Sequence, residues 1–263
     1  VKKLENGNYF LGVHIADVSY YVREGSLLDQ EALLRGTSIY LLDRVIPMLP
    51  KELSNGICSL NAKEDRYALS VLMEINPAGE VVSSDIQKTI INVTERMNYT
   101  DVYAILQQDK TRQKVLTKYQ QYESHFKLME ELAHILKDRR SKAGSLDLNL
   151  PESKIIMDEN GFAIDIQKYE LTFANEIIEQ FMLTANETVA EKFYWLEVPF
   201  IYRVHEEPDY DKVQELNKFL FNLGYQIKCT KEAIYPGTFA KVLEQVKGKP
   251  EERVVSNLVL RTL

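Results

Sequence analysis

The chain has 263 residues, of which 45% are hydrophobic, and this excludes a disordered protein because a full core can be buried. The formal net charge is −7, which argues against a free-standing nucleic-acid binder, since such proteins normally present a basic face. Because no apolar run approaches about 18–20 residues, we expect no membrane span.

The two cysteines also limit the class of protein. Cys58 and Cys229 lie far apart and neither belongs to a CxxC pair, so we expect no zinc site and no disulfide framework. This pattern favours a reducing, cytoplasmic location, and the first residues show no signal peptide. The chain begins without Met and stops inside an apolar pattern, so we expect a fragment of a longer protein.

In chain order, the first elements are short strands. Alternating and then continuous apolar residues predict a strand over 9–16, and Ser26 predicts the start of a helix that Gly36 ends. A strand over 37–42 follows. Pro47 and Pro50 then bracket a loop.

The middle of the chain changes from strands to helices. The pattern predicts strands over 67–75 and 80–97, joined by an N-P-A-G turn, and then a helix over 101–108. From 112 to 142 it predicts one long, charge-rich helix that is closed by Gly144.

The last third contains a hairpin and several helices. The predicted strands are 145–151, 153–157 and 162–170, of which the last two are joined by a D-E-N-G turn. They are followed by a helix over 173–196 capped by Thr172, a strand over 200–205, and helices over 208–224, 238–247 and 251–263. Strands come first and helices later, without βαβ alternation, so we predict an α+β fold in one domain spanning 1–263.

Polar side chains are unusually dense among the apolar residues of 9–75. Burying such a group without a partner costs roughly 2–7 kcal/mol, so these side chains either pair with one another or line a wet cleft. They are His14, Asp17, Tyr40, Arg44, Asn61, Asp65 and Arg66.

Several of these residue types have a functional and a structural interpretation. Tyr40 and Tyr99 are either ordinary half-buried tyrosines or flat rings on which a base stacks. Glu176 and Glu179 lie on one face of a predicted helix. They are either catalytic carboxylates or buried partners of arginine or backbone groups. His14 and Asp17 point to opposite faces of a strand, which favours structural pairing over a metal site.

The order of the motifs is more specific than any single residue. The motifs are GVHIADVSYYV, RGTSIYLLDRVIPMLPKELSNGICSLN, DRYALSVLMEI, RMNYTDVYAIL, GSLDLNLPESKI, EIIEQFMLTAN and YRVHEEP. Together they resemble the catalytic (RNB) domain of the RNase II/RNase R exoribonucleases, and RNase R more than RNase II. The resemblance implies a mixed or antiparallel sheet packed with long helices. It also implies removal of 5′-mononucleotides from the 3′ end of single-stranded RNA by Mg²⁺-assisted hydrolysis.

The resemblance assigns substrate-binding roles to four residues. Tyr40 corresponds to the tyrosine that stacks on the 3′-terminal base and fixes the length of the last product. Tyr99 corresponds to a second aromatic contact, and Glu179 to a glutamate that contacts the terminal nucleotide. Leu148 stands where the family usually has a phenylalanine that clamps the base from the other side.

Two parts of the family pattern are absent from this sequence. They are the D-x-x-x-x-x-D-x-D-D run that holds the metal and the HFGL…TSPIRRY stretch that supplies a catalytic arginine. We therefore expect no catalytic and no metal-binding residue within the chain, and an inactive fragment. The resemblance implies flanking cold-shock and S1 domains that capture RNA, and no small-molecule cofactor.

Two other hypotheses remain open at this point. One is a relative that binds RNA or acts as a scaffold without catalysis. The other is a metal-independent hydrolase that uses Glu179 with His205.

Overall fold

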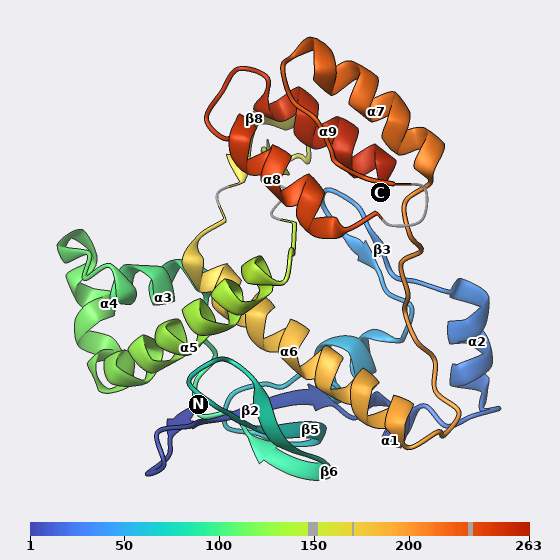
Figure 1. The fold of residues 1–263 in the computed structure, drawn as a ribbon. Helices are drawn as coiled ribbons and strands as arrows, with labels where there is room; N and C mark the ends of the chain where they lie inside the picture. The colour runs from blue at the N-terminus through green and yellow to red at the C-terminus, as the bar shows by residue number, and fades with distance from the viewer. Residues whose placement is uncertain (147–151, 170, 231–233) are drawn as a thin grey trace.

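The computed structural model describes residues 1–146, 152–169, 171–230 and 234–263. Within these ranges the chain forms an antiparallel sheet covered by helices and a separate cluster of C-terminal helices (Figure 1). The predicted α+β class is confirmed. No helix of the described residues is long and apolar enough to cross a membrane.

The main sheet has the strand order β1-β2-β5-β6 and every neighbouring pair is antiparallel. Its strands are β1 (Lys2–Lys3), β2 (Tyr9–Ala16), β5 (Asp65–Ile75) and β6 (Val81–Asn92). Alternate residues of β2 and β5, among them Leu11 and Met73, face the core, which follows from the two-residue period of a strand.

Two long helices cover one face of this sheet (Figure 1). They are α5 (Glu123–Lys142) and α6 (Phe173–Trp195), which contribute Leu132, Leu136, Ile177 and Phe181 to the core. β6 forms an edge of the sheet, and Lys192 of α6 donates to the Ser84 carbonyl oxygen there at 3.0 Å. A lysine at that place discourages another strand from joining the edge.

Shorter elements surround this core. They are α1 (Val18–Tyr21), α2 (Leu27–Arg35), the hairpin of β3 (Ile39–Tyr40) and β4 (Val45–Ile46), a π-helical segment (Glu52–Ile57), α3 (Tyr99–Leu106), α4 (Gln113–Lys118), and the hairpin of β7 (Glu152–Met157) and β8 (Ala163–Tyr169). As predicted, Ser26 caps α2 by accepting from the Asp29 amide, and Gly36 ends it in the left-handed conformation.

The last three helices have a core of their own. Residues from α7 (Tyr210–Asn222), α8 (Pro236–Val246) and α9 (Glu252–Thr262) form it, including the fully buried Val213, Leu220 and Phe239. The C-terminal end of α5 approaches this cluster where Gly144 lies against Gly237 of α8.

Two predicted elements are wrong. The helix expected over 112–142 is broken, because Tyr119 turns into a small core with Ile105 and Phe126 between α4 and α5. The strand expected over 200–205 is not formed, since that segment pairs with no described strand. The strand predicted over 37–42 shortens to the two residues of β3.

Candidate nucleic-acid interface

The β3–β4 hairpin presents Tyr40 to solvent. The hairpin is closed by a bond from the Leu41 amide to the Arg44 carbonyl oxygen at 2.8 Å. Its base is fixed because the Ser38 hydroxyl accepts from the Met48 amide at 2.9 Å and Arg35 of α2 donates to the Pro47 carbonyl oxygen at 3.2 Å. The side chain of Tyr40 is 79% exposed on this anchored hairpin.

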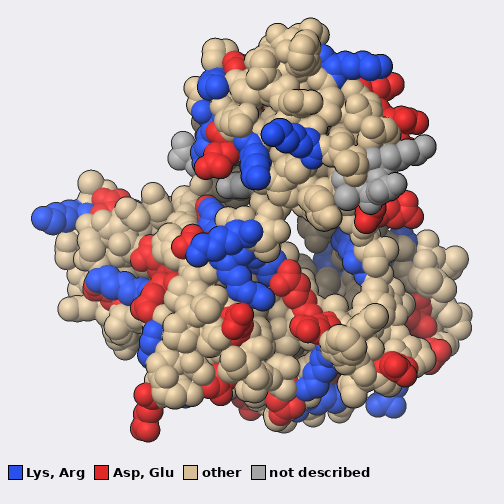
Figure 2. All heavy atoms as spheres, viewed as in Figure 1, with Lys and Arg blue, Asp and Glu red and all other residues tan. Residues whose placement is uncertain are grey.

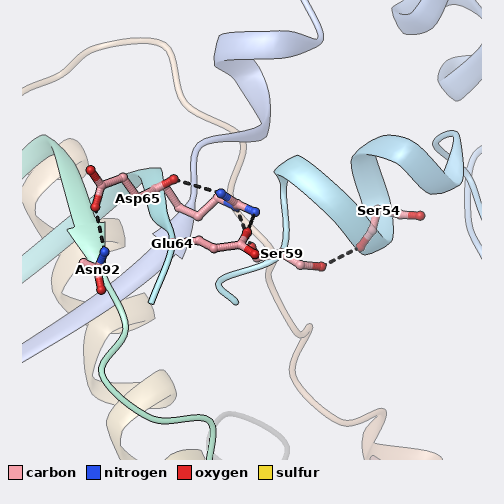
Figure 3. A network of polar contacts seen from close by, with 6 residues as sticks. Ser54, Ser59, Glu64, Asp65 and Asn92 are labelled. Atoms are coloured by element: carbon pink, nitrogen blue, oxygen red, sulfur yellow. Dashed lines mark hydrogen bonds and ion pairs between the residues drawn. The ribbon is translucent and has the colours of Figure 1, made fainter. Parts of the chain in front are cut away.

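A polar network ties the neighbouring loop to the end of the main sheet (Figure 3). The Arg66 guanidinium donates to the Ser59 carbonyl oxygen at 3.0 Å and to the Asp65 carbonyl oxygen at 2.9 Å, and it pairs with the Glu64 carboxylate. Asn92 of β6 donates to the Asp65 carboxylate at 2.7 Å. These bonds hold the loop that follows the Tyr40 hairpin.

Most of the dense polar groups of 9–75 are therefore paired, but mainly with residues outside the set and not with one another. Structural pairing is confirmed for His14 and Asp17. His14 Nδ1 lies 2.7 Å from the Ser70 hydroxyl, and the buried Asp17 accepts from the Ser19 hydroxyl at 2.6 Å. The Tyr40 hydroxyl has no hydrogen-bond partner among the described residues. Structural pairing therefore does not account for the exposed Tyr40 side chain.

Tyr99 and Glu179 are also exposed, on two different helices. Tyr99 is the first residue of α3, whose cap is the Asn98 side chain, accepting from the Asp101 amide at 2.8 Å. Tyr99 is 45% exposed. The Glu179 carboxylate on α6 has no hydrogen-bond partner among the described residues, whereas Glu176 pairs with Lys137 of α5.

No hydrogen bond, ion pair or ring contact joins Tyr40, Tyr99 and Glu179 in the described part of the chain. The surface is hollowed between the C-terminal helices and the body below (Figure 2), and the β3–β4 hairpin and α6 both lie beside this hollow (Figure 1). Leu148 lies outside the described residues. The shared pocket for these four residues stays a prediction.

The Glu179 and His205 pair required by a metal-independent hydrolase is not observed. His205 Nε2 lies 2.8 Å from the Leu263 carbonyl oxygen, in the segment before α7. This bond holds the imidazole against the end of α9, and no contact with Glu179 is formed among the described residues. Nothing in the geometry favours that mechanism.

The described residues do not offer a metal centre. No group of three or more His, Cys, Asp or Glu side chains in the described ranges could hold an ion. Mg²⁺ binds through carboxylate and other oxygen ligands gathered at one place, so this set of residues does not fit it.

A thiol nucleophile is also not supported. Burial raises the pKa of the Cys58 thiol above its ordinary value. A raised pKa leaves less thiolate at neutral pH, and the thiolate is the reactive form.

A hollow that sequence reasoning missed lies between β6 and α6. It has a volume of about 670 Å³ and is lined by residues that include Ser84, Thr184, Thr188, Lys192 and Trp195. Thr184 and Thr188 are four residues apart, which places both on one face of a helix. This spacing is the sequence feature that could have indicated a polar hollow beside α6. None of the predicted substrate-binding residues lines it.

Comparison with solved structures defines the class of protein. The fold is similar to that of Mycoplasma genitalium RNase R, solved in complex with ribose methylated single-stranded RNA, with a TM-score of 0.89 and 31% identity. That match covers 100% of this chain and 40% of the other. The chain therefore has the fold of the corresponding part of that RNase R.

Sequence comparison identifies the family. The RNB domain profile matches residues 1–263, and the chain belongs to the RNB domain family, as the motifs indicated. It is 46% identical over 262 residues to Ribonuclease R 1 of Lactococcus lactis and 47% identical over 264 residues to Ribonuclease R of Thermotoga maritima. Each match covers 100% of this chain, but 32% and 36% of those relatives, so the chain spans about a third of their length.

Proposed function

We propose that this chain is part of a 3′-to-5′ exoribonuclease that hydrolyses single-stranded RNA to 5′-mononucleotides. The observation that carries the proposal is the unbroken match of all 263 residues to the RNB family, including relatives named Ribonuclease R. The similar Mycoplasma structure, which holds single-stranded RNA, supports RNA as the ligand.

In this proposal the exposed side chains seat the 3′ end of the RNA. Tyr40 stacks on the terminal base, an interaction that contributes about 1–3 kcal/mol per base. Tyr99 supplies a second aromatic contact and Glu179 contacts the terminal nucleotide. Leu148, which lies outside the described residues, would close the base clamp from the other side. The exposure of Tyr40 on a hairpin anchored at its base supports its role.

The hydrolytic chemistry is assigned to groups outside the described residues. A Mg²⁺ ion held by groups outside the described residues would supply Lewis-acid chemistry for hydrolysis. The described side chains do not fit that ion, so we expect this chain alone to be inactive. Flanking cold-shock and S1 domains would supply the basic surface that this chain, at a net charge of −7, does not provide.

The state of the two cysteines is relevant to the cellular location of the protein. Cys58 and Cys229 are both free in the structure. Free thiols persist in reducing surroundings, which supports the proposed cytoplasmic location.

The test compares this chain with the complete polypeptide that contains it, using uniformly labelled oligo(A). We expect the complete polypeptide to release mononucleotides with Mg²⁺ and to stop when EDTA is added, and the 263-residue chain to release none. Hydrolysis by the isolated chain that EDTA abolishes would contradict the assignment of the metal ligands to other residues.

The same assay tests Tyr40. We expect Tyr40→Ala in the complete polypeptide to lengthen the final undegraded oligonucleotide, because the stack that holds the last nucleotides is lost. Tyr194→Ala is the matched control, since Tyr194 is an exposed tyrosine at the C-terminal end of α6. An unchanged end product in Tyr40→Ala would overturn the stacking role.

One alternative accounts for the same observation. The lack of a metal-holding cluster among the described residues is also what a non-catalytic RNA-binding relative would show. RNA binding by the complete polypeptide without any release of mononucleotides would establish that alternative.

A further inference from the structure

The segment of residues 198–208, which we name the α6–α7 segment, has the sequence of a strand but no strand partner. Its central residues, FIYRVH at 200–205, are rich in β-branched and aromatic residues, which are typical of strands. The chain runs as a single extended trace along one side of the molecule between α6 and α7 (Figure 1).

The backbone of the α6–α7 segment is unpaired within the described protein. No N–H or C=O group of residues 198–208 makes a backbone–backbone hydrogen bond with any described residue. Strand-forming residues are normally ordered by a ladder of such bonds, so a row of donors and acceptors is free to pair.

Side chains nevertheless hold the α6–α7 segment at both ends. The Phe200 ring stacks on Phe193 of α6, with centroids 4.7 Å apart and planes at 15°, and Tyr202 packs on Phe200 at 5.1 Å. At the other end, His205 bonds to the Leu263 carbonyl oxygen. The segment is thus preorganised, which lowers the entropic cost of pairing.

The apolar side chains between these anchors face solvent. Ile201 is 95% exposed and Val204 is 79% exposed. The neighbouring end of α6 adds the exposed Trp195 and Leu196. Several large exposed apolar side chains on one short stretch of chain are typical of an interaction surface.

We propose that residues 200–205 become a strand by pairing with an extended segment of the same longer polypeptide, outside this chain. This occupant is favoured by length, because the matched region is 32–39% of the similar Ribonuclease R proteins and 40% of the Mycoplasma chain. A segment of the same polypeptide is present at a high effective concentration beside residues 200–205. Such a segment can bond to the free backbone groups and pack against the apolar side chains. The proposal does not depend on nuclease activity.

Amide hydrogen exchange of residues 198–208 tests this, in the 263-residue chain and in the complete polypeptide, each at two protein concentrations. We expect fast exchange in the chain alone and exchange slowed by about a hundredfold or more in the complete polypeptide. Fast exchange in both overturns the proposal. Protection of the isolated chain that grows with concentration also overturns it, because the occupant is then a second copy.

A substitution separates pairing from a general change in stability. Ile201→Lys places a charge where the partner strand would cover it, so we expect lost protection in the complete polypeptide and no change in the melting temperature of the 263-residue chain. Phe162→Lys is the matched control, since Phe162 is also a solvent-facing apolar residue but its carbonyl oxygen is already bonded to the Asp158 amide. Equal loss of protection in both variants would count against local pairing.

Discussion

At the scale of single residues, α6 shows how two identical side chains acquire different surroundings. Glu176 pairs with Lys137 of α5, whereas the Glu179 carboxylate faces solvent with no hydrogen-bond partner in the described part of the chain. A carboxylate with no structural partner can be removed without loss of a contact. Stability measurements therefore separate a binding role for Glu179 from a structural one.

We expect Glu179→Ala to leave the melting temperature of the chain unchanged and to lower the turnover of RNA by the complete polypeptide. Glu176→Ala is the matched variant three residues away, and it should cost up to about 1 kcal/mol of unfolding free energy, because a partly exposed ion pair is lost. Thermal unfolding and an oligonucleotide assay measure the two effects. A fall in melting temperature for Glu179→Ala would favour a structural role.

We expect His14 to make the stability of the protein depend on pH. Loss of solvent around the imidazole, which bonds to the Ser70 hydroxyl, lowers the pKa of His14 below its ordinary value of 6.5. The unfolded chain then binds a proton at a higher pH than the folded chain does. The contribution is complete above pH 6.5 and is lost as the pH falls from there through the folded-state pKa.

We expect the unfolding free energy of His14→Gln to fall less between about pH 7.5 and about pH 5 than that of the unchanged chain, because one group that takes up a proton on unfolding is gone. Urea denaturation at both values measures it. His125→Gln is run beside it, because burial also lowers the pKa of His125 and both residues contribute to the total. An identical pH dependence with and without His14 would contradict the assignment.

At the scale of elements, the end of α5 and the start of α8 meet through two glycines. Gly144 has φ +92, and a Cβ on it would lie 2.9 Å from the Gly237 nitrogen and 3.0 Å from its Cα. The close approach therefore requires glycine for two reasons, a left-handed backbone and contact with another backbone.

We expect Gly144→Ala to destabilise the chain more than Gly161→Ala does. Gly161 has a similar φ of +83 but nothing within 4 Å of the position that an added methyl group would occupy, so only the backbone strain of about 1–2 kcal/mol applies there. Chemical denaturation of both variants measures the difference. Equal losses would show that the contact with Gly237 is not maintained in solution.

The elements that could be predicted from sequence are those with local signals. The capped helix α2, the β7–β8 hairpin with its D-E-N-G turn, and α6 behind Thr172 follow from caps and turns. The break at Tyr119 and the unpaired residues 200–205 could not be predicted, because packing against α3 decides the first and a missing strand partner decides the second.

The candidate site was less accessible to sequence reasoning than the fold. The cost of burying polar groups indicated that the buried Asp17 would be paired, but it left a paired position and a cleft position both open for His14 and Arg66. The exposure of Tyr40, Tyr99 and Glu179 did not follow from any local pattern, since a strand or helix pattern is equally compatible with a buried side chain. Their roles came from the family resemblance alone.

At the scale of the whole molecule, the described residues form two large hydrophobic cores. One joins the main sheet to α5 and α6, and the other joins α7, α8 and α9. Cores that share few side chains can open separately.

We expect Leu220→Ala to cost about 2–5 kcal/mol and to speed amide exchange in α7–α9 more than in the main sheet. Leu132→Ala, at an equally buried site in the other core, should show the reverse pattern. Hydrogen exchange resolved by residue measures both. Uniform acceleration across the chain in either variant would indicate a single cooperative unit.

The chain contains one tryptophan, Trp195, at the last residue of α6, where it is 73% exposed and lies edge-on to Tyr194. Ultraviolet emission excited at the red edge of absorption therefore comes from a single place, the junction between α6 and the segment beyond it. That light is sensitive to the polarity around the indole. The molecule thus carries an internal reporter at this junction, on a different element from the hairpin that presents Tyr40, and no dye has to be attached.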